Sequence, residues 1–486
     1  MKTFIAIIAG PVSGLLAFWM LKHLGTAPAC MAGTVAWMAV WWITEAVPIP
    51  ITSLLPIVLF PLFGIAELGA TTAYYGKEVI FLFLGGFLLA LGIERSGLHR
   101  RLALMIVARV GASPARLVLG TLLSTGLLSM WINSTAAVLV MLPIALSLET
   151  HAKGHDRFGM VLSLAVAYGA SIGGMATPVG TPPNLFFMSL WKQQFPHLPP
   201  IGFGQWMLFG VPYALLFLLF TWLLMTRVLY PMKRAGLVDH KAVGDQRSEL
   251  GPTSRDELLA ALVFAVTAVL WITGDDIQFS PSFTLHGWRS VMGLKALGDP
   301  AIAIVGGLLL FLIPSSAKGP VGGSERRMLL DWDFAQARIP WGVMLLIGSG
   351  FAIAGGIDAS GLSATIGTAM AGMYTGSQVL QVAAVCSGVT LLSELGSNTA
   401  VAGLVLPIMA STADGWGMSP QSLMIPATIA ASCGFMLPIA SPMQAIVFAS
   451  GKLSVKQMMR AGVWMDVLGV LLLVVLWWLI GAVVFG

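Results

Sequence analysis

The sequence predicts an all-α integral membrane protein with about eleven transmembrane helices, two re-entrant hairpins and two inverted-topology repeats. Three observations support this prediction. Charged residues are scarce, apolar stretches long enough to cross a bilayer recur along the chain, and the two halves share short motifs in the same order.

Composition excludes an ordinary soluble domain. Of the 486 residues, 57% are hydrophobic and only 10% are charged, which is too little charge to cover the surface of a soluble protein. A hydrocarbon core of about 30 Å requires roughly 20 apolar residues per helix, and such stretches occur from the first residues to the last. The formal net charge of +5 does not indicate a nucleic-acid partner, because the basic residues lie in short loops. The expected surroundings are membrane lipid.

Two apolar segments carry a polar, Gly- or Ser-rich middle. These segments, 117–147 and 380–411, fit re-entrant hairpins better than single spans, because broken backbone in a membrane must line a cavity or lie buried in protein. About eleven full spans then remain. We expect residues 230–257 to form a cytoplasmic linker between the halves.

The basic residues predict the orientation of the chain. With eleven spans and two hairpins that do not cross, the most basic loops all fall on one side, which the positive-inside rule assigns to the cytoplasm. We therefore predict a multi-pass inner-membrane protein with a cytoplasmic amino terminus and an external carboxyl terminus. The basic residues in question are Arg100, Arg101, Arg109, Arg116, Lys153, Arg157, Lys233, Arg234, Lys241, Arg247, Lys318, Arg326, Arg327, Lys452, Lys456 and Arg460.

Short motifs recur at a nearly constant spacing. The string GIERSGL at 92–98 matches GIDASGL at 356–362, an offset of 264 residues, and the triplet at 133–135 matches that at 397–399 at the same offset. Residues 181–184 (TPPN) match 441–444 (SPMQ) at an offset of 260. Three matches in one order indicate an internal repeat, with residues 1–229 as the first copy and 258–486 as the second.

Charge next to the first motif indicates that the repeats are inverted. Residues 99–116 carry four Arg and one His, whereas residues 359–379 carry no Lys or Arg. The charge rule therefore places these equivalent segments on opposite sides of the membrane. Secondary transporters commonly use this symmetry to form two matched gates around one central site.

A polar triplet lies in the middle of each hairpin, Asn133-Ser134-Thr135 in the first and Ser397-Asn398-Thr399 in the second. Two hairpin tips that meet at mid-depth would present hydroxyl groups, amide groups and the positive ends of helices, which suit a small anion without any fixed cation. The alternative is that these residues make ordinary polar contacts between helices. Such contacts would explain a single triplet, but they explain less well why two triplets recur at the repeat spacing.

Helix-breaking residues follow each hairpin. Segments 173–184 and 435–444 combine Pro or Gly with Ser, Thr, Asn or Gln. A broken helix exposes backbone carbonyls, and hard oxygen ligands of this kind suit Na⁺. A plain proline kink is the alternative, but the breaks recur in register with the triplets.

These motifs, together with WWITEAVPIP at 41–50, resemble the divalent anion:sodium symporter family, which includes sodium-coupled dicarboxylate and citrate carriers, along nearly the whole chain. The resemblance implies a scaffold domain, a moving transport domain, elevator-type alternating access and a homodimer. It also implies that Na⁺ is the coupling ion. This chain differs from the family pattern at Asn133-Ser134, where the usual order is reversed, and at Met443-Gln444 and Gly396.

The resemblance implies two sets of ligand-binding residues. The expected substrate contacts are Asn133, Ser134, Thr135, Thr181, Pro182, Ser397, Asn398, Thr399, Ser441 and Pro442. One expected sodium site comprises Ser129, Asn133, Ser134 and Gly180, and the other comprises Ser393, Gly396, Asn398 and Ala440.

Two features lie outside the expected substrate and sodium residues. Glu394 is the only acidic residue within the second hairpin, and it is either a functional group or an acceptor for backbone donors of the hairpin. Residues 169–173 match G-x-S-x-G, a motif of serine hydrolases. All seven histidines fall in loops or at span ends, so no general base is evident and we do not expect an enzyme.

The function predicted is secondary active import of a small di- or tricarboxylate, of the succinate, malate, fumarate or citrate class, coupled to Na⁺. Moving one charge against 100 mV costs about 2.3 kcal/mol, so a dianion costs roughly twice that and import needs cotransported cations. Sodium-independent dicarboxylate exchange and sulfate transport by the same fold are the alternatives. A passive channel is a further reading, which saturable, gradient-dependent uptake would exclude.

Overall fold

The computed structural model describes residues 2–111, 113–150, 157–232, 248, 250–280, 283–294, 296–316, 327–372 and 376–485. Most of the 230–257 linker lies outside this range. So do seven of the basic residues that predict the orientation, namely Lys153, Lys233, Arg234, Lys241, Arg247, Lys318 and Arg326.

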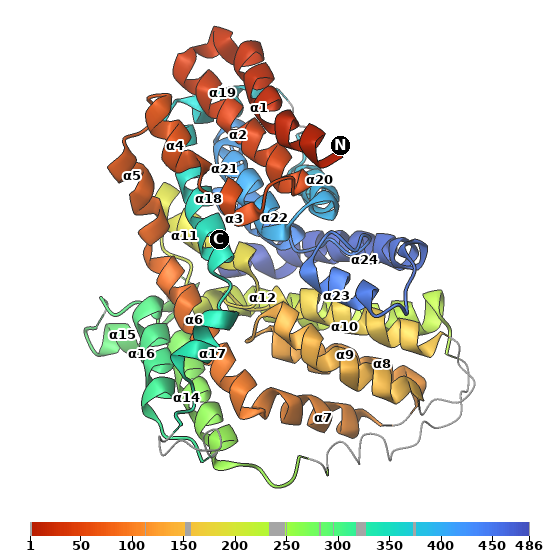
Figure 1. The fold of residues 1–486 in the computed structure, drawn as a ribbon. Helices are drawn as coiled ribbons and strands as arrows, with labels where there is room; N and C mark the ends of the chain where they lie inside the picture. The colour runs from red at the N-terminus through yellow and green to blue at the C-terminus, as the bar shows by residue number, and fades with distance from the viewer. Residues whose placement is uncertain are drawn as a thin grey trace.

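The described chain is almost entirely helical (Figure 1). The helices of the first half are α1 (Lys2–Leu21), α2 (Thr26–Thr44), α3 (Ile49–Thr52), α4 (Leu55–Leu62), α5 (Leu68–Ala73), α6 (Glu78–Ser96), α7 (Leu98–Val110), α8 (Pro114–Ser129), α9 (Ser134–Thr150), α10 (Phe158–Gly174), α11 (Pro182–Gln194) and α12 (Phe203–Leu223). Those of the second half are α14 (Arg255–Ile272), α15 (Trp288–Val291), α16 (Asp299–Leu312), α17 (Trp332–Arg338), α18 (Trp341–Ala359), α19 (Leu362–Ala371), α20 (Gln378–Leu395), α21 (Asn398–Trp416), α22 (Pro420–Ala430), α23 (Pro442–Ala449), α24 (Val455–Leu476) and α25 (Ala482–Phe485). A short antiparallel hairpin, β1 (Ile277–Ser280) and β2 (Phe283–Leu285), follows α14.

Within the described residues, seven helical stretches are long and apolar enough to cross a membrane: Phe4–Leu24, Thr26–Thr44, Leu68–Ser96, Phe203–Leu229, Trp341–Ala359, Gln378–Leu395 and Val455–Phe485. The chain is therefore a multi-pass membrane protein. Shorter apolar helices, among them α10 and α16, accompany these stretches. The count of eleven spans stays a prediction.

Burial distinguishes helices of the interior from helices of the periphery. All 17 residues of α10 are buried, as expected for a helix that is apolar on every face and surrounded by protein. In α1 only 11% of the spanning window is buried, and the large side chains of Phe4, Leu15 and Trp19 are exposed. An apolar helix with so little protein cover suits a position against lipid.

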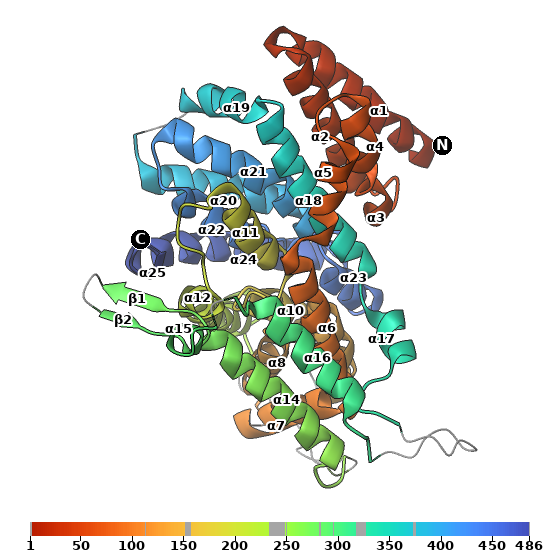
Figure 2. The same ribbon diagram turned by 90° about the vertical axis from the view of Figure 1, so that its left-hand side faces the viewer.

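The helices form two packed groups (Figures 1 and 2). α8 and α9 lie side by side with α10, while α14 and α16 pack on α6. Within the second half of the chain, α21 packs on α18 and α19, and α20 packs on α22 and α24. Contacts between the halves include those of α6 with α14 and α16, of α11 with α21 and of α12 with α24.

The helix boundaries recur at the offsets of the sequence motifs. Gly97 (φ 82°) and Gly361 (φ 76°) both adopt the left-handed conformation, which glycine tolerates without steric cost. Each of them separates two helices, α6 from α7 and α18 from α19. At the same offset of 264, α9 begins at Ser134 and α21 at Asn398. The repeated GI-x-x-SGL motif is thus a helix stop followed by a helix start.

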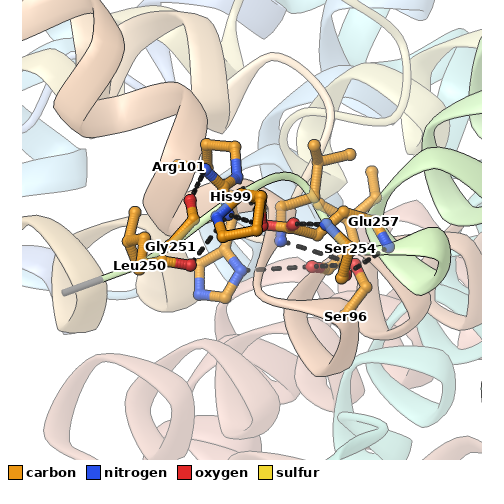
Figure 3. A network of polar contacts seen from close by, with 10 residues as sticks. Ser96, His99, Arg101, Leu250, Gly251, Ser254 and Glu257 are labelled. Carbon is orange, nitrogen blue, oxygen red and sulfur yellow. Dashed lines mark hydrogen bonds and ion pairs between the residues drawn. The ribbon is translucent and has the colours of Figure 1, made fainter. Parts of the chain in front are cut away.

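An ion pair with three additional hydrogen bonds fixes α7 to the beginning of α14 (Figure 3). The guanidinium of Arg101 donates to Glu257 Oε1 at 2.7 Å and to the carbonyls of Leu250, Gly251 and Pro252 at 3.0–3.1 Å. Glu257 in turn closes a capping box with Ser254 at the start of α14, an arrangement that satisfies free N–H groups of the first helical turn. These contacts use most of the donors of Arg101.

Candidate functional site

The two polar triplets and the two helix breaks line one cavity of about 330 Å³, a size within the range of ~300–1,000 Å³ typical of small-ligand pockets. All ten residues that the family resemblance implies as substrate contacts are among its lining residues. The remaining wall is largely apolar and comes from α3, α6, the break after α10, the region from Pro340 into α18, and α23. It consists of Ile49, Pro50, Phe83, Phe87, Val179, Gly180, Pro340, Gly342, Val343, Leu346 and Met443. The structure thus brings together residues as far apart in sequence as Asn133 and Ser441.

Four helices begin at this cavity. The residues that line it include Ser134 and Asn398, where α9 and α21 start, and Pro182 and Pro442, where α11 and α23 start. The first N–H groups of a helix have no intrahelical acceptor, and the helix dipole adds partial positive charge there. No Lys, Arg or His is found among the lining residues. An anion in this cavity would therefore be held by backbone amides, hydroxyls and side-chain amides of the described residues.

In the first tip, the chain turns between Ser129, the last residue of α8, and Ser134. Asn133 Oδ1 accepts a hydrogen bond from the N–H of Thr135 at 2.8 Å, so this oxygen stabilises the tip itself. Ser134 Oγ lies 2.7 Å from Ser129 Oγ and 3.3 Å from the carbonyl oxygen of Gly180. Three of the four residues expected at the first sodium site therefore place oxygens next to one another, while the Asn133 oxygen is engaged by Thr135.

The second tip has the same contacts one repeat later. Ser393 Oγ donates to Asn398 Oδ1 at 2.9 Å and lies within hydrogen-bond distance of the Ala431 carbonyl at 2.5 Å. In the first tip, Ser129 Oγ correspondingly donates to the Ala170 carbonyl at 2.6 Å. Ser134 thus occupies the position that Asn398 occupies in the second repeat.

The other residues of the second expected sodium site lie on either side of this pair. A Cβ placed on Gly434 would meet the Ser393 carbonyl oxygen at 3.0 Å and the Ala440 Cβ at 3.2 Å, so Ser393 and Ala440 are brought together. Gly396 lies in the turn between α20 and α21, where an added Cβ would be 3.6 Å from the backbone of Ile43.

The first helix break is held open by side-chain hydrogen bonds. The amide of Asn184 donates to the carbonyls of Gly174, Met175 and Thr177 at 2.8–3.3 Å, and the Thr177 hydroxyl donates to the carbonyl of Met130 at the hairpin tip. These bonds replace the intrahelical partners that the break removes. They leave the Gly180 carbonyl directed at Ser134.

The second break is held differently. Glu394 is 2% exposed, and its two oxygens accept the N–H groups of Met436 and Leu437 at 2.8 and 2.9 Å. Asp466 of α24 accepts the N–H of Phe435 at 3.3 Å. Glu394 therefore accepts hydrogen bonds from backbone N–H groups in the helix break that follows α22. The sequence alone suggests backbone donors of the second hairpin as its partners. Sequence reasoning missed Asp466 altogether.

Gln444 differs from its counterpart in the first repeat. It is fully buried, and neither polar atom of its side chain has a hydrogen-bond partner, although Asn184 makes three such bonds. Ser441 instead caps α23 by accepting the N–H of Gln444 at 3.3 Å.

The serine of the hydrolase-like motif has no catalytic surroundings in the described part of the chain. Ser171 lies within the buried helix α10, and its hydroxyl has no hydrogen-bond partner. His99 is bound through Nδ1 to the Ile93 carbonyl at 3.1 Å. His151, His155 and His240 lie outside the described residues.

Comparison with known proteins gives matches along nearly the whole chain. The family described as the sodium:sulfate symporter transmembrane region matches residues 9–485. The chain is 36% identical over 495 aligned residues to proteins named sodium-dependent dicarboxylate transporter SdcS from Staphylococcus aureus strains MRSA252 and NCTC 8325, covering 99% of this chain and 92% of each relative.

A solved structure has the same fold. It is the YdaH transporter of Alcanivorax borkumensis, described as having an unusual topology, with a TM-score of 0.55 and 16% identity, covering 86% of this chain and 88% of that chain. These relatives are transporters. The match over nearly the whole chain and the identity to the Staphylococcus aureus proteins together establish that this chain belongs to the sodium:sulfate symporter family.

Proposed function

We propose that the chain is a secondary active transporter that imports small di- or tricarboxylate anions of the succinate, malate, fumarate or citrate class together with Na⁺. One observation carries this proposal: four helix starts and two polar triplets line a single cavity without a Lys, Arg or His. Such a lining binds two carboxylates through hydrogen bonds and dipoles. The relatives named as sodium-dependent dicarboxylate transporters support the same substrate and ion.

The sodium sites proposed are the two oxygen clusters behind the tips. Ser129, Ser134 and Gly180 supply two hydroxyls and a carbonyl at the first, and Ser393 and Asn398 supply a hydroxyl and an amide oxygen at the second. Neutral oxygen ligands suit a hard monovalent cation. Each cluster also contacts a tip that lines the cavity, so a bound Na⁺ would stabilise the tip in the conformation that binds the anion.

The movement proposed is an elevator. The helical pairs α8–α9 and α20–α21, with α10, α11, α22 and α23, would form the transport domain, and α1 to α6 with α14, α16 and α18 the scaffold. Within the first set α8 and α9 contact α10, and α20 and α21 contact α22; within the second, α14 and α16 contact α6. Helix α18 contacts α21 across the proposed division. We also propose the inner membrane, a cytoplasmic amino terminus, eleven spans and a homodimer. Mass determination in detergent and labelling of engineered cysteines in loops from outside would test these points.

Uptake of [¹⁴C]succinate into proteoliposomes tests the proposed function. An inward Na⁺ gradient should support uptake, and replacement of Na⁺ by K⁺ should abolish it. Uptake that ignores Na⁺ but requires succinate inside would instead identify a sodium-independent exchanger. If sulfate is transported, and succinate is neither transported nor competes with sulfate, the chain is a sulfate transporter. Asn398→Ala serves as the inactive control, since it removes a side chain that lines the cavity and contacts Ser393.

A further inference from the structure

A second cavity adjoins the first. It has a volume of about 370 Å³ and shares Phe87, Asn133, Thr135 and Pro340 with the substrate cavity. Its other lining residues are Ala90, Leu91, Glu94, His99, Ile132, Ala136, Leu139, Val140 and Arg338. The two cavities therefore meet at the tip of the first hairpin.

The position of the second cavity indicates the compartment that it faces. It reaches the end of α6 and the beginning of α7 through Glu94 and His99. This region carries Arg95, Arg100 and Arg101, and the positive-inside rule assigns such a cluster to the cytoplasm. The second cavity thus lies on the path between the substrate cavity and the cytoplasm.

Arg338 is the only Lys or Arg among the described residues that line either cavity. It is the last residue of α17, and its side chain is 48% exposed. The guanidinium lies 3.8 Å from the ring centre of Phe334, which fixes its plane by a cation–π contact. Its Nε lies 3.4 Å from Glu94 Oε1, a distance longer than a good charge-assisted hydrogen bond.

Neighbouring arginines differ from Arg338 in how their donors are used. Arg101 is held by Glu257 and three carbonyls (Figure 3). Arg95 has a side chain only 7% exposed and forms an ion pair with Asp331 through Nη2, while its Nη1 is buried without a hydrogen-bond partner and so is closed to a ligand. By contrast, no described residue accepts a hydrogen bond from either terminal nitrogen of Arg338. The guanidinium is thus positioned by Phe334 and Glu94 while two nitrogens remain available.

We propose that Arg338 binds a carboxylate group of the substrate on the cytoplasmic side of the site. The paired nitrogens of a guanidinium match the two oxygens of a carboxylate, and the substrate cavity itself has no such group. An anion that leaves the tip of the first hairpin would pass to Arg338, and Glu94 would compete with it for the guanidinium. This inference rests on the proposed function, because it requires a carboxylate substrate that crosses the membrane.

The test compares substrate affinity from the two sides of the membrane. Right-side-out and inverted vesicles from a bacterial host that expresses the full chain give the KM for [¹⁴C]succinate at the external and cytoplasmic faces. Arg338→Gln should raise the KM at the cytoplasmic face by about tenfold, as expected for a lost hydrogen bond to a charged group. The external KM should stay within about twofold, because the proposed contact with Arg338 is made only on the cytoplasmic side of the site.

Three further variants keep the test decisive. Arg338→Lys should restore part of the cytoplasmic affinity, and Glu94→Gln should lower the cytoplasmic KM by removing the competing carboxylate. Arg109→Gln, an exposed arginine at the end of α7, should change neither KM.

The proposal is overturned if Arg338→Gln leaves the cytoplasmic KM unchanged, or if it raises the KM equally at both faces. If the Arg338→Gln protein does not fold, the Glu94→Gln variant decides the question. A cytoplasmic KM that is unchanged in Glu94→Gln then overturns the proposal. Wild-type vesicles that carry none of succinate, malate, fumarate and citrate in either orientation would refute the proposed function instead.

Discussion

Glu394 offers a sharp test of how the second helix break is maintained. Its carboxylate accepts two backbone N–H groups, from Met436 and Leu437, inside the protein. Replacement by Ala leaves both half-buried donors without this acceptor. Since the break positions Ser441 at the cavity, the same change should displace part of the site.

The magnitude follows from these two hydrogen bonds. A hydrogen bond to a charged group contributes about 1.5–3 kcal/mol, so losing two gives a decrease of about 3–6 kcal/mol in the free energy of unfolding. Polar contacts between membrane helices average about 0.6 kcal/mol, which places the lower bound near 1 kcal/mol. Glu394→Gln keeps one acceptor oxygen, and its effect should be about half as large.

Thermal unfolding in detergent and Na⁺-driven succinate uptake measure the two consequences. Glu78→Ala is the matched control, because Glu78 is 57% exposed in an ion pair with exposed Lys192, and such surface pairs contribute about 0–1 kcal/mol. Glu394→Ala should unfold at a clearly lower temperature than this control and should lose uptake. A Glu394→Ala protein as stable and as active as Glu78→Ala would show that the carboxylate does not hold the break.

Three further predictions follow from the contacts described. Asn398→Ala should abolish succinate uptake and leave a monodisperse protein in detergent; wild-type uptake would contradict its place in the site. Ser129→Ala and Ser393→Ala should each raise the Na⁺ concentration needed for half-maximal uptake by about tenfold, measured at saturating succinate, and an unchanged Na⁺ dependence in both would remove the two proposed sodium sites. The hydrogen bond from Arg95, helped by a backbone N–H, holds the pKa of Asp331 below its usual value. This stabilisation is present above the unfolded-state pKa of about 3.9 and is lost as the pH falls through the folded-state pKa. Asp331→Asn should therefore lower the melting temperature at pH 7, with a difference that shrinks below about pH 4; a difference that does not change with pH would refute this account.

The sequence allowed much of the site to be predicted because the polar triplets violate the apolar pattern around them. A run such as Asn133-Ser134-Thr135 between apolar arms is costly in lipid unless it has a partner or a ligand. Its recurrence 264 residues later identified both tips at once, and the family resemblance supplied the contacts at Thr181 and Ser441. All of these line one cavity.

The contacts behind the tips could not be predicted in the same way. Asp466 lies 72 residues after Glu394 in an otherwise apolar helix, and no spacing rule relates a carboxylate to backbone donors on a separate segment. The reversed order of Asn133 and Ser134 does not tell which residue reaches the neighbouring serine, and in the structure Ser134 makes the serine contact that Asn398 makes one repeat later. The short β1–β2 hairpin also had no periodic signal, because its strands have four and three residues.

The lining of the substrate cavity has a consequence for how uptake varies with acidity. None of its described residues has a side chain that gains or loses a proton near neutrality, where histidine is the usual group to do so. Dicarboxylates, however, change from monoanion to dianion in the mildly acidic range. The pH profile of the initial uptake rate should therefore follow the titration curve of the transported acid, shifting from one acid to the next, and so reveal which ionic form the protein selects.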